Sequence, residues 1–213
     1  TAIDNIKTEA VQLIGSQAGR SLDTVVREVL NGGTNVQYHE GERASRSAII
    51  ATDTLTVKAV RAAVRTLKRQ NAETIDGSFV GIIHPDVAFD LMSDPTWVEW
   101  HKYTDNDAMF TNEIGKIANV RFVETTEAKI FEDAGGSTGK FDIYSTLIIA
   151  KNAYGTTNIE GGGLELITKQ KGSAGTADPL DQRSTVGWKA TKTAERLVED
   201  YMVRIETACS YAA

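Results

Sequence analysis

Apolar residues near the N-terminus recur at steps of three and four from Ile3 to Leu30. This spacing predicts one long amphipathic helix. At 1.5 Å per residue it would be roughly 40 Å long, unusual for a compact domain of this size. Asn31-Gly32-Gly33 follows as a stop signal, because glycine tolerates the backbone beyond a helix end. Gly15 and Gly19 inside the helix indicate either a tolerated weak point or kink, or the close approach of a neighbouring backbone.

A second helix is predicted from about Leu55 to Asn71, and it carries a basic stripe. Its apolar positions fall on one side, and the cations that flank them are Lys58, Arg61, Arg65, Lys68 and Arg69. The stripe has three possible interpretations. It is a face exposed to solvent, it pairs with acidic patches on a neighbouring copy, or it contacts nucleic acid. Lys58, Arg61 and Arg65 are therefore candidate subunit-interface residues.

Two prolines mark the starts of shorter helices, because proline suits the first helical turn. Pro85 follows a strand-length apolar run from Phe79 to Ile83. Pro95 precedes Trp97 and Trp100, which are three residues apart and so share one helix face. This pair indicates either local core packing or an aromatic anchor at a subunit contact, and both tryptophans are candidate interface residues.

Beyond Gly115 the apolar pattern becomes that of strands. The predicted strands are Val120–Val123, Tyr144–Ala150 and Leu164–Thr168, with a short one earlier at Val36–Tyr38. Near the C-terminus, Tyr201, Val203 and Ile205 alternate with Arg204 and Glu206. This alternation predicts a strand with one apolar face and one charged face. The fold class is α+β, with most of the sheet in the C-terminal half.

Composition narrows the class of protein. The 213 residues carry 23 Lys and Arg against 29 Asp and Glu, so an overall basic nucleic-acid binder is not expected. The single cysteine, Cys209, cannot form an internal disulfide, which fits a reducing cytoplasm. The sequence has neither a stretch of about 20 apolar residues nor a secretory signal, so no membrane partner is expected.

Motifs for chemistry are incomplete. Ala134–Lys140 resembles a phosphate-binding loop, but Ala134 replaces its first glycine and Phe141 its hydroxyl residue, so we expect a surface hairpin. His39-Glu40 lacks the second histidine of a zinc helix. Asp105-Asn106-Asp107 opens like a calcium loop, but the positions after it do not supply the required ligand and glycine.

The histidines and the cysteine also give no indication of a catalytic or metal site. The three histidines are far apart, and Cys209 reads as a small buried apolar residue rather than a nucleophile. We therefore expect no catalytic residue, no cofactor and no metal, and we predict that the protein is not an enzyme.

Several long strings resemble the N4 gp56-like family of phage major capsid proteins. They are Gly81–Leu91 (GIIHPDVAFDL), Trp97–Asp105 (WVEWHKYTD), Asn112–Thr125 (NEIGKIANVRFVET) and Val186–Ala190 (VGWKA). The similarity runs over essentially the whole chain.

The resemblance implies the HK97-like capsid fold, in which a long spine helix and a small sheet form the P-domain and an α/β lobe forms the A-domain. Residues 1–51 would then be the spine and first part of the P-domain, 52–165 the A-domain, and 166–213 the return to the P-domain. In this family an N-terminal arm and an extended hairpin, the E-loop, precede the spine. This chain lacks both, so we expect that it does not assemble shells by itself.

The implied function is that of a structural major capsid subunit of a tailed double-stranded DNA phage or prophage. It would self-assemble into the hexamers and pentamers of an icosahedral shell, be synthesised in the bacterial host cytoplasm, and end in the virion capsid. Its implied partners are other copies, scaffolding and portal proteins, and packaged double-stranded DNA bound without sequence specificity. Alternatives are an encapsulin-type nanocompartment shell protein, a phage tail or adaptor protein, and a nucleotide-binding hydrolase using the loop near Lys140.

Overall fold

The computed structural model describes residues 6–101, 115–136, 140–157, 161–173, 175–180 and 182–212. The chain forms two compact units, and each is built from segments far apart in the sequence. Unit 1 comprises residues 1–26 and 156–194, and unit 2 comprises residues 27–155 and 195–213. The predicted domains with boundaries at 51 and 165 divide the chain elsewhere, and they stay a prediction.

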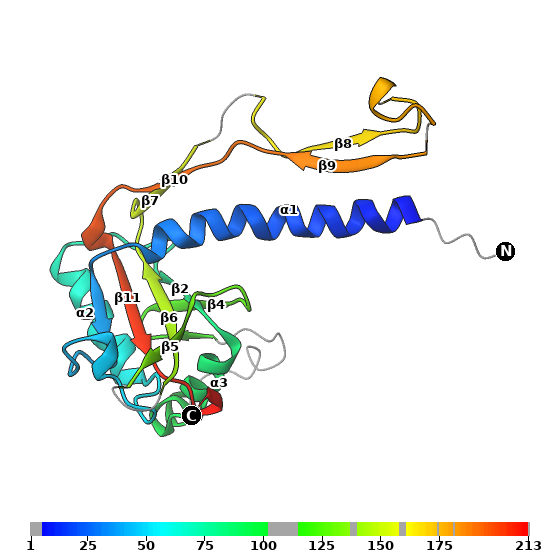
Figure 1. The fold of residues 1–213 in the computed structure, drawn as a ribbon. Helices are drawn as coiled ribbons and strands as arrows, with labels where there is room; N and C mark the ends of the chain where they lie inside the picture. Colours follow the sequence, from blue (N-terminus) through cyan, green and yellow to red (C-terminus); the bar gives the residue numbers. More distant parts are fainter. Residues whose placement is uncertain are drawn as a thin grey trace. The chain divides into compact units, whose positions relative to one another are not determined.

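Helix α1, Ile6–Asn31, is the predicted long helix, and its last residues belong to unit 2. In unit 1 its companion is the hairpin of β8, Glu165–Lys169, with β9, Thr185–Lys189, which runs alongside it in Figure 1. The Trp188 indole N–H donates to the Gln17 side chain of the helix at 3.1 Å. A Cβ atom added at Gly15 or Gly19 meets nothing within 4 Å, so no described backbone approaches these glycines closely.

Unit 2 is built on a seven-stranded mixed sheet (Figure 1). The strand order is β1-β11-β6-β2-β4-β3, and β5 pairs with β6 beside this path. The bounds are β1 Val36–Tyr38, β2 Phe79–Ile83, β3 Lys116–Ile117, β4 Val120–Glu124, β5 Ile130–Gly135, β6 Phe141–Ile149 and β11 Met202–Thr207. Pairing is parallel for β1 with β11 and for β2 with β4, and antiparallel elsewhere.

The helices of unit 2 are α2, Val57–Arg69, α3, Pro85–Ser93, and α4, Pro95–His101. Both predicted proline starts are therefore found. Short 3-10 turns complete the chain at Arg46–Ala48, Gly175–Ala177, Glu199–Tyr201 and Ser210–Ala212. Where the chain passes between the units, β7, Tyr154–Thr156, pairs with β10, Ala194–Arg196.

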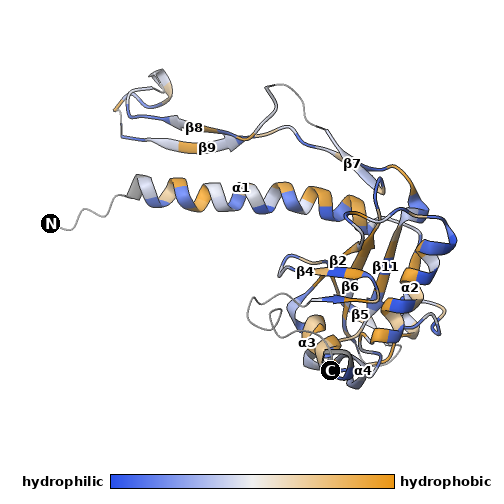
Figure 2. Cartoon of the chain, turned by 180° about the vertical axis from the view of Figure 1, so that it is seen from behind, coloured by the Kyte–Doolittle hydropathy of each residue, from blue (hydrophilic) through white to orange (hydrophobic). Residues whose placement is uncertain are grey.

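The hydrophobic core lies between one face of the sheet and the three shorter helices. Figure 2 shows its strands as predominantly hydrophobic. The core contains Leu67 of α2, Phe79 of β2, Leu91 of α3 and Ile205 of β11, each at most 1% exposed. No described helix is long and apolar enough to cross a membrane. The helices and mixed sheet make the fold α+β, as predicted.

Candidate functional site

The basic stripe of the second helix is a structural feature of unit 2. Thr56 caps α2, because its hydroxyl oxygen accepts a hydrogen bond from the Ala59 backbone N–H at 3.2 Å. The valines and Leu67 of the helix are buried against the sheet, whereas all five cations are exposed. Lys68 and Arg69 fall in the last turn, where positive charge interacts favourably with the helix dipole.

Lys58 differs from the other cations because acidic residues surround it. Its ammonium pairs with Glu40 and lies 3.1 Å from a Glu42 carboxylate oxygen. These carboxylates raise the pKa of Lys58. Partial burial opposes ionisation of Glu40, but hydrogen bonds from Lys58 and Thr56 still lower the pKa of that carboxyl. The charge of Lys58 is therefore largely balanced within the chain.

The other four cations line a hollow of about 490 Å³. Arg61, Arg65, Lys68 and Arg69 surround it together with Val64 of α2 and Ala118 and Asn119 of the β3–β4 turn. None of the four cations forms an ion pair within the described part of the chain. The structure thus brings Arg61 and Arg65 together in one concave basic surface and leaves Lys58 outside it. We call this surface the α2 basic hollow.

The two tryptophans do not form a described surface. Trp97 is 5% exposed and belongs to the hydrophobic core, so its burial favours local packing over an anchor for a partner. The side chain of Trp100 lies outside the part that the structure describes. The exposed apolar residues in this region are instead Phe89, Met92 and Val98, which are 65%, 41% and 43% exposed.

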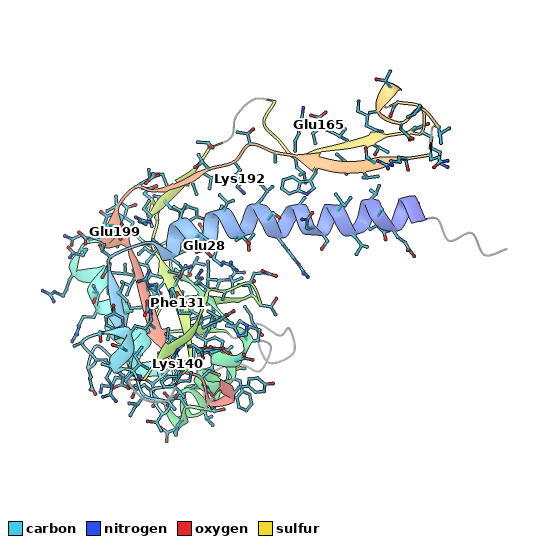
Figure 3. All side chains as sticks on the ribbon, viewed as in Figure 1. Glu28, Phe131, Lys140, Glu165, Lys192 and Glu199 are labelled. Carbon is cyan, nitrogen blue, oxygen red and sulfur yellow. The ribbon has the colours of Figure 1, made fainter. Side chains whose placement is uncertain are left out.

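Sequence reasoning missed a buried ion cluster on the other face of the sheet. Glu206 is 0% exposed, and its carboxylate accepts two 2.7 Å hydrogen bonds from the guanidinium of Arg46. Arg204 lies 2.8 Å from the same carboxylate. The Arg46 guanidinium stacks 3.5 Å from the ring centre of Phe131, which Figure 3 labels. The alternation of β11 is correct, but its charged face is buried because Arg46 and Phe131 cover it.

The C-terminal end of α1 is fixed in unit 2 by side chains that the sequence pattern did not identify. The Ser145 hydroxyl donates to the Asn31 side-chain oxygen at 2.5 Å. Arg204 and Arg196 donate to the backbone carbonyls of Asn31 and Val29, respectively. The last carbonyls of a helix lack partners within it, so Arg204 supplies a donor to Asn31, and Arg196 adds a second donor to the Val29 carbonyl, which also accepts the Gly32 N–H.

A cluster beside α3 has the residue types of a catalytic site, but its contacts are structural. The His84 Nδ1 accepts a hydrogen bond from the Asp86 backbone N–H and caps the helix. The Tyr144 hydroxyl donates to the Asp86 carboxylate at 3.1 Å, and burial followed by this contact raises the pKa of Tyr144. Cys209 is 1% exposed, and burial raises the pKa of its thiol to about 11. A buried, protonated thiol is a poor nucleophile.

Among the described residues, the loops that resemble phosphate-binding and calcium-binding motifs do not form a ligand site. Gly135 and Phe141 face each other across the β5–β6 hairpin, so a strand follows the glycine-rich stretch, where a phosphate-binding loop needs a helix. Residues 137–139 of that stretch and the calcium-like residues 105–107 lie outside the described part. Within the described part, no group of three or more histidine, cysteine or acidic residues could hold a metal ion.

Comparison with solved structures gives the fold. The chain matches the capsid of Ralstonia phage GP4 at TM-score 0.56 and 18% identity, over 82% of this chain and 52% of that one. It matches the head structure of Helicobacter pylori bacteriophage KHP40 at TM-score 0.67 and 14% identity, over 97% and 70%. The holo-SrpI encapsulin complex of Synechococcus elongatus PCC 7942 matches at TM-score 0.60 and 9% identity, over 99% and 68%. The fold is the HK97-like capsid fold.

These solved chains are longer than this one, which spans between about half and 70% of their lengths. No curated protein sequence matches the chain. A family model described as phage capsid protein matches residues 4–166, more than half of the 213 residues. The chain therefore belongs to the phage capsid protein family.

Proposed function

We propose that this chain is the shell-forming part of a major capsid protein of a tailed double-stranded DNA phage or prophage, of the N4 gp56-like family. The observation that carries the proposal is the match of the fold to phage capsids over nearly the whole chain. In this role the protein is structural and not an enzyme. Residues 1–51, with helix α1 as the spine, would begin the P-domain, residues 52–165 would form the A-domain, and residues 166–213 would return to the P-domain.

Assembly would proceed through repeated contacts between identical copies. A ring of copies forms when two different surfaces of one chain meet heterologously around a symmetry axis. Each contact can be weak, because a hexamer or pentamer forms many at once. The proposed partners are scaffolding and portal proteins and packaged DNA. The protein would be synthesised in the host cytoplasm and end in the virion capsid. The interface role of Lys58, Arg61 and Arg65 stays a prediction.

Sedimentation of the gene product that contains this chain, after expression in bacteria, tests the proposal. We expect fast-sedimenting particles made of closed shells. If only monomers or small discrete oligomers are recovered, the proposal is wrong.

The second candidate is an encapsulin-type compartment, and the match to the SrpI encapsulin favours it specifically. The contents of particles purified from the native host separate the two. Nuclease-protected double-stranded DNA supports the phage capsid, whereas one enclosed enzyme in many copies supports the compartment.

A further inference from the structure

We propose that the α2 basic hollow is a binding site for the phosphate backbone of duplex DNA, recognised without regard to sequence. This inference rests on the proposed function for its biological setting, but the site is argued from the geometry of unit 2 alone. It reassigns Arg61 and Arg65 from a contact between copies to a contact with nucleic acid.

The charge of the hollow is concentrated and unbalanced. Helix α2 carries five cations and no acidic residue, in a chain whose net charge is −6. Glu40 and Glu42 balance Lys58 only, whereas the four cations of the hollow have no ion-pair partner among the described residues. Because like charges four residues apart destabilise a helix, such a surface is costly unless an anion occupies it.

The spacing of the arginines suits a nucleic-acid strand. Arg61, Arg65 and Arg69 follow one another at four-residue steps, so their positions rise about 6 Å at each step and about 12 Å in all. One strand of duplex DNA carries a charge every 3.4 Å along its axis, so this distance spans about three to four phosphates. One guanidinium group can donate two parallel hydrogen bonds to the oxygens of one phosphate, whereas a lysine ammonium acts as a point charge.

The composition of the surface argues against a protein partner. A specific protein interface is centred on buried aromatic or aliphatic anchors. The solvent-facing side of α2 has none, because its valines and Leu67 are buried and no residue of this helix is among the large exposed apolar side chains. The exposed Phe89 and Met92 of α3 offer such anchors, so contacts between copies fit that region better. Phosphate binding requires only cations and room, and the hollow has both.

Fluorescence anisotropy of the purified chain with a short mixed-sequence DNA duplex tests the site across a series of salt concentrations. The four cations predict a slope of about −3 to −4 when the logarithm of the binding constant is plotted against that of the salt concentration. We expect Arg65→Gln to lower the magnitude of this slope by about 0.9, and Arg65→Lys to leave it almost unchanged. The triple change of Arg61, Arg65 and Arg69 to Gln should weaken binding at least about tenfold at low salt.

The matched control removes exposed lysines of unit 1, Lys169→Gln with Lys171→Gln, and should leave the slope unchanged. Circular dichroism confirms that each variant is folded. The inference is overturned if the wild-type chain does not bind the duplex at low salt, or if the control weakens binding as much as Arg61→Gln with Arg65→Gln. Loss of self-association by the hollow variants, with DNA binding intact, would assign the surface to a second copy and also overturn it. Shell formation is measured separately by sedimentation. A failure of the proposed function can therefore be distinguished from a failure of DNA binding by the hollow.

Discussion

The two units of this chain differ in how they are stabilised. Unit 2 has a continuous core in which helices cover one face of a seven-stranded sheet, and a buried ion cluster lies on the other face. In the described part of unit 1, only Ala18, Asp178 and Ala194 are buried. Its large apolar residues Leu13 and Leu180 are 71% and 73% exposed. Unit 2 resembles an independently folding domain, whereas unit 1 does not enclose a core.

A physical consequence follows for unit 1. An isolated helix and a two-stranded hairpin are each only marginally stable in water. Unit 1 therefore gains little stability from its own packing. A shell subunit can tolerate this, because neighbouring copies supply the missing contacts on assembly. On the proposed function, unit 2 is formed before assembly and unit 1 is stabilised during it.

The largest expected effect comes from breaking the buried ion cluster. Glu206→Gln should lower the free energy of unfolding of unit 2 by about 3–5 kcal/mol, because it leaves Arg46 and Arg204 without a buried counter-charge. The matched change in unit 1 is Glu165→Gln, which removes the exposed Glu165–Lys189 pair and should cost at most about 1 kcal/mol. Urea unfolding followed by circular dichroism measures both. Similar losses for the two variants would contradict the proposed difference between the units.

A matched pair of leucines gives the next effect. Leu67 of α2 is 0% exposed, so Leu67→Ala should destabilise unit 2 by about 2–5 kcal/mol by leaving a cavity. Leu166 of β8 is 44% exposed, and Leu166→Ala should cost less than about 1 kcal/mol. Unfolding midpoints in urea compare them. A large loss for Leu166→Ala would show that unit 1 has a packed core of its own.

An intermediate effect depends on pH. Burial opposes ionisation of Asp53, but hydrogen bonds from Arg43 and the Ile50 N–H lower the pKa of this carboxyl below its usual value. Its folded pKa is below its unfolded value, so its stabilising contribution is present above about pH 4 and is lost as the pH falls through the folded pKa. Asp53→Asn should cost about 1–2 kcal/mol at neutral pH.

The same variant should flatten the decline of stability below about pH 4, because the titrating group is gone. Urea unfolding at a series of pH values measures this slope, with Glu165→Gln as the control that should retain the wild-type decline. An unchanged slope in Asp53→Asn would show that Asp53 does not govern the acid response.

The smallest effect concerns the contact between hairpin and helix in unit 1. Trp188→Phe removes the indole N–H bond to Gln17 and should cost about 0.5–1.5 kcal/mol locally. Hydrogen exchange should become faster in β8, β9 and the first part of α1, and stay unchanged in the sheet of unit 2. If exchange in unit 2 accelerates equally, the units are not energetically separate.

Elements with strong periodicity could be predicted from the sequence. The long helix, the basic helix and the strand Phe79–Ile83 were found because each has a regular apolar pattern bounded by glycine, proline or polar residues. Strand β5 was missed, because the acidic residues Glu132 and Asp133 and a shift in register interrupt its alternation. Two-residue β3 is too short to have a detectable pattern.

Side-chain surroundings were harder to predict than elements. The sequence placed Glu206 on the charged face of its strand but not its burial, since alternation reports which residues share a face and not what covers that face. Its partner Arg46 is 160 residues away, and no local pattern links the two. The sequence identified the five cations of the basic stripe. Only the fold shows that carboxylates neutralise Lys58, whereas the other four cations line the α2 basic hollow.

Cryo-electron microscopy of particles from the gene product that contains this chain tests the central claim most directly. The account predicts closed icosahedral shells, with rings of five and six copies and the unit 2 sheet recognisable in every subunit. A reconstruction in which this fold forms an open filament, a small discrete oligomer or a minor component attached to a shell of another protein would contradict it.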